Sequence, residues 1–249
     1  MEDQSTHTCN NCGAVSNGYF CPECGQRLSV NRVNFKETIQ DFADVVFSVN
    51  GPLLTTLKGL IKQPGLVIRE YLQGKRKKYY KPVAFFLLTT VVYLIIRQLI
   101  GFDPFRNSMI QVEEGSLDGT TLTDARNYML LNINNFLFIF VFTLATFSKL
   151  FFFKKYSLAE FLAISFYLIG IYTLFVTCTM FLVQYIGDYL QPIGVVVMFL
   201  YFVFAMCSLF QKSYFFVIIK SIVLFILAFF AYFMTAYSLS VLIVFLKQG

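Results

Sequence analysis

Long runs of apolar residues, separated by short polar segments, make up most of the chain after residue 82. A helix needs roughly 20 predominantly apolar residues to cross a hydrocarbon core about 30 Å thick. Five runs come close to this length, so the pattern predicts an all-α integral membrane protein whose helical bundle covers residues 83–249. The predicted spans are residues 83–101, 133–153, 159–183, 193–210 and 221–246.

Residues 31–82 also show apolar positions at helical spacing, but with many charged residues between them. Asn34 and Glu37 form a capping-box-like pair at the start of one apolar stripe. Pro52 and Pro64 each suit the first turn of a further short helix. These helices are too short and too polar to span a bilayer, so we expect amphipathic juxtamembrane helices that lie in its surface.

Composition agrees with a membrane body. Of the 249 residues, 57% are hydrophobic and 14% are charged, and the mean hydropathy is +0.65. These values are typical of a multi-pass membrane protein and far from those of a soluble domain. The first thirty residues contain no apolar signal-peptide segment, so we expect the amino terminus to stay in the compartment where the chain is made.

Near the amino terminus, four cysteines follow the pattern C-x2-C-x8-C-x2-C; they are Cys9, Cys12, Cys21 and Cys24. Two such pairs can surround one Zn²⁺ ion with four thiolates in a closed structural site. Gly13 and Gly25 each follow the second cysteine of a pair, and glycine tolerates the positive φ that such turns often need. Residues 1–30 are therefore predicted to be a zinc-ribbon head, folded by its structural Zn²⁺ because so short a segment has little core.

Other uses of these cysteines stay open at this stage. Two disulfides would suit an exported small domain, and redox-active pairs would normally accompany a βαβ pattern, which this sequence lacks. His7 could replace one cysteine as a metal ligand, although four thiolates already complete the coordination shell.

Charge argues against nucleic acid as the partner of the head. Residues 1–30 contain Glu2, Asp3 and Glu23, with Arg27 as their single basic residue. A phosphate-binding surface needs clustered Lys and Arg. We therefore expect the head to dock on protein, either an unidentified partner or the membrane body of its own chain.

A strongly basic segment precedes the first predicted span. Its centre, called the basic collar below, consists of Lys75, Arg76, Lys77, Lys78 and Lys81. Each basic residue near an anionic bilayer is attracted to it by about 1 kcal/mol. The collar is thus a candidate site for anionic lipid or an acidic partner, or alternatively a signal that only sets membrane orientation. Tyr79 and Tyr80 lie where aromatic anchors at the membrane interface are expected.

The charges between the predicted spans alternate. The loop over residues 102–132 is mainly acidic, whereas Lys154 and Lys155 follow the second span. The positive-inside rule then places the amino terminus and the head in the cytoplasm and the carboxyl terminus on the other side of the membrane.

The sequence contains no recognisable catalytic pattern of the HExxH, GxSxG, Walker or GxGxxG type. Charged residues such as Arg97, Lys149, Glu160 and Lys220 fall near the ends of spans, not at the midplane where an ion or proton relay would need them. We therefore expect a non-enzymatic membrane adaptor or regulatory protein that binds lipid and a protein partner, with homo-oligomers possible. The alternative is a small oligomeric transporter, channel or lipid-handling protein, and a membrane enzyme is the least favoured class.

Two stretches, CxxC…CPxCGQ and PLLTTLKGLIKQPGLVIREYLQGKRKKYYKPVAFF, resemble an uncharacterised family of bacterial membrane proteins. This is domain of unknown function family 3667, seen mostly in Bacteroidota, and the resemblance covers residues 9–26 and about 52–96. It implies a protein of the bacterial inner membrane and indicates no activity. More loosely, a head followed by five spans looks like the Yip-type membrane proteins, which is a likeness of architecture alone.

Overall fold

The computed structural model describes residues 7–28, 51–102, 121–132, 135–211 and 214–248. The head contains two short antiparallel strands, β1 (His7–Thr8) and β2 (Val15–Ser16). The helices are α2 (Gly51–Lys62), α3 (Pro64–Leu72), α4 (Pro82–Leu99), α5 (Thr121–Leu131), α6 (Leu137–Phe151), α7 (Leu158–Ile186), the 3-10 helix η1 (Asp188–Leu190), α8 (Pro192–Phe210) and α9 (Tyr214–Gln248). The helix predicted after Asn34 lies outside the described residues.

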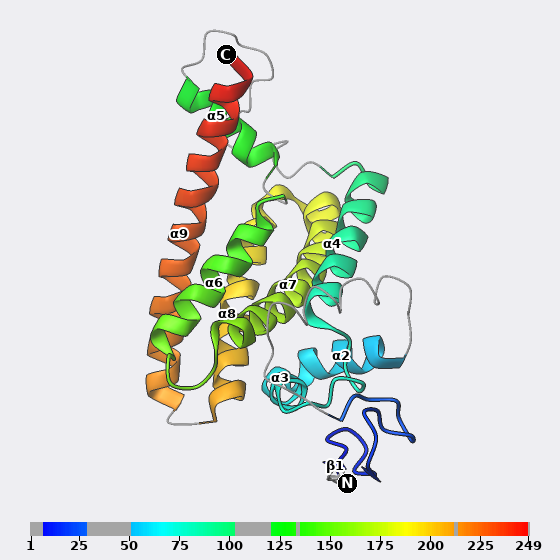
Figure 1. The fold of residues 1–249 in the computed structure, drawn as a ribbon. Helices are drawn as coiled ribbons and strands as arrows, with labels where there is room; N and C mark the ends of the chain where they lie inside the picture. Colours follow the sequence, from blue (N-terminus) through cyan, green and yellow to red (C-terminus); the bar gives the residue numbers. More distant parts are fainter. Residues whose placement is uncertain (1–6, 29–50, 103–120, 133–134, 212–213, 249) are drawn as a thin grey trace.

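The helices α4, α6, α7, α8 and α9 run alternately up and down through the bundle in the view of Figure 1. The head and the α6–α7 and α8–α9 connections lie at its lower end, whereas α5 and the carboxyl terminus lie at its upper end. Helix α7 is central, because 72% of its most apolar window is buried, against 33% for α4, α8 and α9. The other three helices therefore turn most of their apolar side chains outward, as expected where lipid surrounds a bundle.

Four helices are long and apolar enough to cross a membrane, namely α4, α7, α8 and most of α9. This is the pattern of a multi-pass membrane protein, as predicted. The remaining predicted span, residues 133–153, contains the apolar helix α6 of 15 residues, about 22 Å long at the usual rise. Helix α9 has 35 residues and extends past both ends of the predicted segment 221–246.

Part of the loop predicted over residues 102–132 is helical. Helix α5 packs against α9, and Lys247 Nζ lies 4.9 Å from the centroid of the Tyr128 ring. The sequence analysis missed α5 because its apolar periodicity is weak. The helix is stabilised by packing against the end of α9.

The amphipathic helices α2 and α3 were expected to lie in the membrane surface. Protein covers part of their apolar faces, whereas Leu54 and Ile61 of α2 and Leu66 of α3 are 59%, 50% and 38% exposed. Leu60 of α2 and Val67 and Ile68 of α3 are at most 2% exposed and belong to the main core. Tyr201 of α8 donates a hydrogen bond to the Leu60 carbonyl at 3.0 Å. An apolar face is buried equally well by lipid or by protein, so the amphipathic pattern could not distinguish the two.

Charged residues at the ends of the spans form hydrogen bonds with backbone groups next to the helix termini. Arg97 Nε, in the last turn of α4, donates to the Phe102 carbonyl at 3.2 Å. At the start of α7, Glu160 accepts a hydrogen bond from the Ser157 N–H at 2.6 Å and completes a capping box. Arg97 and Glu160 therefore have local structural roles at the helix ends, which is where the sequence analysis predicted them to lie.

We predict that a compartment-sensitive reporter inserted after Ser5 or Ser157 will report the cytoplasm, because basic residues flank that end of the bundle. A reporter after Asp118 or Gly249 should report the opposite side. Ser157 begins α7 at the lower end of the bundle, and the other three positions lie outside the described residues. Reporters after Ser5 and Gly249 that show the same compartment would require an even number of crossings.

Candidate metal centre and basic collar

Two similar turns hold the cysteines. In the first turn, the Gly13 N–H donates to the Cys9 carbonyl and the Cys9 N–H to the Ala14 carbonyl, both at 2.9 Å. The second turn repeats these bonds with the N–H groups of Gly25 and Cys21, at 2.8 and 2.7 Å. The two glycines have φ of +80° and +66°, a region that strains residues with a side chain. The predicted need for glycine in each turn is therefore confirmed.

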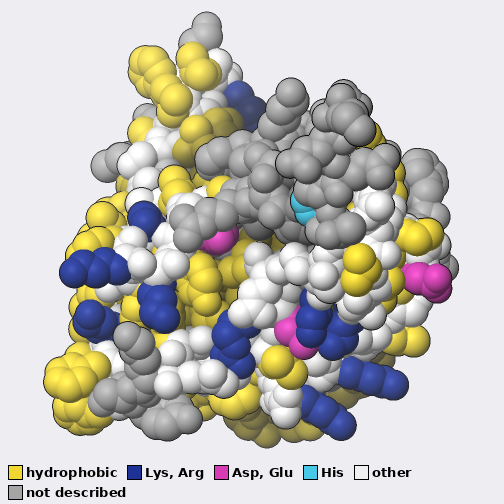
Figure 2. Space-filling view, turned by 60° about the horizontal axis from the view of Figure 1, so that its bottom comes forward, with side chains coloured by type: hydrophobic (Ala, Val, Ile, Leu, Met, Phe, Trp, Pro, Cys, Tyr) yellow, Lys and Arg dark blue, Asp and Glu magenta, His cyan; other side chains and the backbone are white. Residues whose placement is uncertain are grey.

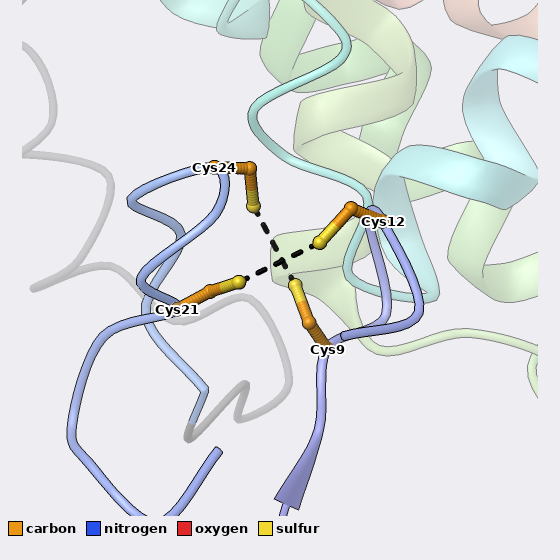
Figure 3. A group of neighbouring side chains, drawn as sticks. All are labelled: Cys9, Cys12, Cys21 and Cys24. Carbon is orange, nitrogen blue, oxygen red and sulfur yellow. Dashed lines mark hydrogen bonds between the residues drawn. The ribbon is translucent and has the colours of Figure 1, made fainter. Parts of the chain in front are cut away.

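The turns bring the four sulfur atoms together at the centre of the head (Figure 3). Each short contact joins one turn to the other, with Cys9 Sγ 3.6 Å from Cys24 Sγ and Cys12 Sγ 3.5 Å from Cys21 Sγ. All four sulfurs lie within 4.8 Å of one another. Four sulfurs bound to one tetrahedral metal at ~2.3 Å would be ~3.8 Å apart, so this group could hold a metal ion.

The alternatives left open by the sequence fit this geometry less well. A disulfide needs a sulfur–sulfur distance of ~2.05 Å, and all six cysteines of the chain are free thiols. His7 lies on β1 with an exposed side chain and is not part of the sulfur group. The candidate ligand set is therefore the four cysteines alone.

The burial of the four cysteines and the pKa of Cys12 both bear on metal binding by this group. Cys9 and Cys21 are each 2% exposed, so half of the set is inside the head. A hydrogen bond with the Ala14 backbone lowers the pKa of the Cys12 thiol, but hydrogen bonds with the other thiols and desolvation raise that pKa to about 12. A divalent cation bound by the four sulfurs would stabilise them as thiolates.

A buried amide ties the head to the segment that carries the basic collar. The Gln26 side chain is 3% exposed; its Nε2 donates to the Gly74 carbonyl, and its Oε1 accepts from the Lys77 N–H at 3.3 Å. One glutamine thus makes a two-point contact with the backbone between α3 and α4. The head therefore docks on the collar segment of its own chain, which precedes the predicted membrane body of residues 83–249.

We predict that Gln26→Ala will undock the head without releasing metal, because the change leaves all four sulfurs in place. The Lys77 N–H loses a buried acceptor, which typically costs about 1–3 kcal/mol. Amide exchange over residues 74–77 should therefore become about tenfold faster in hydrogen-exchange mass spectrometry. Gln73→Ala is the matched control, since Gln73 is exposed on the same segment, and equal exchange in both variants would contradict the prediction.

One carboxylate partly neutralises the collar. Glu70, near the end of α3, accepts hydrogen bonds from Lys75 Nζ at 2.8 Å, Lys78 Nζ at 2.7 Å and the Tyr79 hydroxyl at 2.5 Å. The bond from Lys75, followed by those from Lys78 and Tyr79, lowers the pKa of Glu70 to about 2. Lys75 and Lys78 are therefore engaged by a carboxylate of the same chain, and Lys and Arg side chains gather on this end of the molecule (Figure 2).

The prediction that Tyr79 and Tyr80 anchor the chain at the membrane interface is wrong. Their side chains are 4% and 8% exposed. The Tyr80 N–H donates to Thr56 Oγ1 of α2 at 2.7 Å, and the Tyr80 carbonyl accepts from the Tyr167 hydroxyl of α7 at 2.5 Å. These two residues join the collar segment to the protein core.

We predict that Glu70→Gln will destabilise the protein by about 1 kcal/mol at neutral pH, because charge-assisted bonds to partly exposed groups are replaced by neutral ones. The folded-state pKa of about 2 is below the usual 4.5. The stabilisation is therefore fully present above pH 4.5 and is lost as the pH falls through about 2. Thermal unfolding in detergent should show wild type and variant converging over this window.

The control for this pH series is Glu23→Gln, because Glu23 is exposed on the head. Its unfolding midpoint should follow that of the wild type throughout. A constant difference between wild type and Glu70→Gln down to pH 2 would contradict the assignment.

Residues that the sequence analysis missed hold α3 on α8. The Gly65 N–H donates to Ser208 Oγ at 3.1 Å, and Arg69 Nη1 donates to the carbonyls of Ser208 and Leu209 at 2.5 and 3.0 Å. Arg69 thereby caps the last turn of α8, whose carbonyls have no partner within the helix. Since its partners are 139 and 140 residues away along the chain, no local pattern pointed to this role.

Comparison with known proteins gives one match. The sequence model of DUF3667, a family of proteins of unknown function, matches residues 51–94. The matched segment contains α2, α3, the collar and most of α4, which is the part of the chain held on α7 and α8 by the contacts above. No curated protein and no solved structure matches the chain.

Proposed function

We propose that this protein is a non-enzymatic adaptor or regulatory protein of the bacterial inner membrane, with its head in the cytoplasm and its carboxyl terminus on the other side. In this proposal the four cysteines hold a structural Zn²⁺ ion, since an all-thiolate tetrahedral set is typical of such sites. The head offers a docking surface to a protein partner, and the basic collar holds that surface close to anionic lipid.

The observation that carries this proposal is the two-point contact of Gln26 with the collar segment. A head joined to the bundle by a flexible linker alone would take many orientations. The buried amide instead holds it against the α3–α4 connection, so a bound partner would also have a defined position relative to the membrane.

The head also exposes apolar side chains that its small core does not use. Val15, Tyr19 and Phe20 are 65%, 82% and 63% exposed, and they lie between the two cysteine turns. Exposed aromatic residues are enriched at protein interfaces, where they bury a large area at low entropic cost. We therefore place the partner contact on the segment from Val15 to Phe20.

Photocrosslinking in native membranes tests this function. A photoreactive phenylalanine analogue in place of Phe20 should give a discrete protein adduct, which Cys21→Ser should abolish because the head unfolds without its metal. The same analogue in place of Phe230, which is 62% exposed on α9, serves as the control and should give lipid adducts. Lipid adducts alone at position 20 would contradict an adaptor role.

A second candidate function, lipid handling or transport, rests on a cavity inside the bundle. This cavity has a volume of about 420 Å³ and is bordered by α4, α6, α7, α8 and α9. Its wall is made of aromatic and aliphatic side chains, with Thr173 and Gln191 among its few polar groups. Sites of this size and polarity bind small apolar molecules. Reconstituted protein should then accelerate lipid exchange between bilayer leaflets, and a rate equal to that of protein-free vesicles would exclude lipid scrambling.

A further inference from the structure

A second cavity lies at the lower end of the bundle, where α6 and α8 end and α9 begins. Its volume is about 380 Å³, and its lining consists of five phenylalanines, three lysines and one valine. It shares no residue with the metal centre or the basic collar. Such a combination of apolar wall and cationic groups differs from the cavity inside the bundle, which has no charged residue in its lining.

The floor of this cavity is apolar and already packed. The rings of Phe152 and Phe210 stack with their centroids 4.2 Å apart and an angle of 15° between their planes. Val217 beside them is 6% exposed. The apolar surface still open to a ligand belongs mainly to Phe153 and Phe216 at the edge, which are 60% and 65% exposed, and covering it with methylene groups gains roughly 25 cal/mol per Å² buried.

The lysines have exposed side chains and come from two separate parts of the chain. Lys154 and Lys155 follow α6, and Lys220 belongs to an early turn of α9. Lys154 Nζ lies 5.5 Å from the Phe153 ring centroid, and Lys220 Nζ lies 5.8 Å from that of Phe152. The charged ends are therefore close to the aromatic wall and within reach of a ligand that also touches it.

These three lysines differ from the paired lysines of the collar. Over the described part of the chain, no carboxylate forms an ion pair with Lys154, Lys155 or Lys220, whereas Lys75 and Lys78 share Glu70. Three like charges around one opening repel each other, and an anion between them removes that repulsion.

We infer that this cavity binds one anionic phospholipid, with its phosphate between Lys154, Lys155 and Lys220 and its first acyl methylenes on the Phe152–Phe210 floor. The position at the ends of the spanning helices places the cavity where lipid headgroups meet hydrocarbon. Phe153 and Phe216, which are 60% and 65% exposed at its edge, would contact the acyl chains. A free phosphate would satisfy the lysines but would leave the apolar floor uncovered.

This site goes beyond the proposed adaptor function and does not depend on it. It adds a second candidate contact with anionic lipid beside the collar, and it differs from the collar in that no described carboxylate pairs with its lysines.

The chain contains no Trp, so Phe216→Trp introduces a single tryptophan, which can be excited selectively over the tyrosines, at the edge of the cavity. We would reconstitute the full chain carrying this change in phosphatidylcholine vesicles containing increasing fractions of phosphatidylglycerol with brominated acyl chains. Half-maximal quenching should occur at an at least tenfold lower fraction of brominated phosphatidylglycerol than of brominated phosphatidylcholine. One lysine near anionic lipid is worth about a fivefold change in binding, so three suffice for this preference.

Lysine variants decide which residues are responsible. Replacing Lys154, Lys155 and Lys220 together by Gln should remove the preference for phosphatidylglycerol. Lys220→Gln alone should weaken this preference about fivefold, and it leaves Lys154 and Lys155 in place to set the membrane orientation. The control replaces Lys75, Lys77 and Lys78 by Gln and should retain the preference. Circular dichroism verifies that each variant keeps its fold.

Two results would overturn the inference. Equal quenching by both brominated lipids, or a preference unchanged in the triple variant, would mean ordinary contact with surrounding lipid. Relief of quenching by millimolar glycerol phosphate, at concentrations too low to act by ionic screening, would instead mean that the site serves a free phosphate compound.

Discussion

Cys21→Ser should abolish stoichiometric metal binding and unfold the head, while the membrane bundle stays folded. Cys21 is 2% exposed, and its sulfur contacts Cys12 across the two turns, so its loss opens the site and removes a buried ligand. Structural zinc contributes about 10–16 kcal/mol to small zinc domains, far more than the small core around Cys9, Cys21 and Leu28 could replace. Metal analysis should fall from one zinc per chain to well below half.

Limited proteolysis then reports the consequence for structure. Residues 7–28 should be digested rapidly in Cys21→Ser and in wild type treated with a chelator, while the fragment from α2 onward is protected. Cys178→Ser is the matched control, because Cys178 is a free cysteine of α7 outside the sulfur group. Wild-type protein that contains much less than one equivalent of zinc would exclude the zinc site.

Gly65→Ala should destabilise the whole protein by about 3 kcal/mol or more. A Cβ atom at this position would lie 2.1 Å from the Ser208 carbonyl carbon and 2.4 Å from the Leu209 nitrogen, both backbone atoms. Overpacking of a core typically costs about 1–3 kcal/mol, and separating the helices would also weaken the bonds from Arg69 to the end of α8, which cost about 1.5–3 kcal/mol when a charged donor is involved.

The measurement is the thermal unfolding midpoint in detergent, with Gly194→Ala as the control. Gly194 lies on α8, the helix against which Gly65 packs, but the nearest atom to its added Cβ would be Thr179 Oγ1 at 3.8 Å, so this change should be neutral or slightly stabilising through helix propensity. If both variants unfold at the wild-type temperature, α3 does not pack on α8 as described.

The cysteine group and four of the five predicted spans could be predicted because both depend on neighbours in sequence. The turns around Cys9 and Cys21 close through hydrogen bonds between residues at most five positions apart, so the CxxC spacing and the following glycine already contain the geometry. Long apolar runs likewise form helices whatever surrounds them, since a spanning helix satisfies its own backbone groups. For these features, local spacing was sufficient.

Other features depended on contacts that no local pattern contains. The amphipathic faces of α2 and α3 predicted burial but not what buries them, and the structure covers part of them with α7 and α8. The pairing of Gln26 with Gly74 and Lys77 joins residues about fifty positions apart. The lysine cavity needs the ends of three helices in one place. Hydrophobic burial is non-directional, so the choice of partners, and with it the docked head and the cavity, arises from the packing of the complete chain.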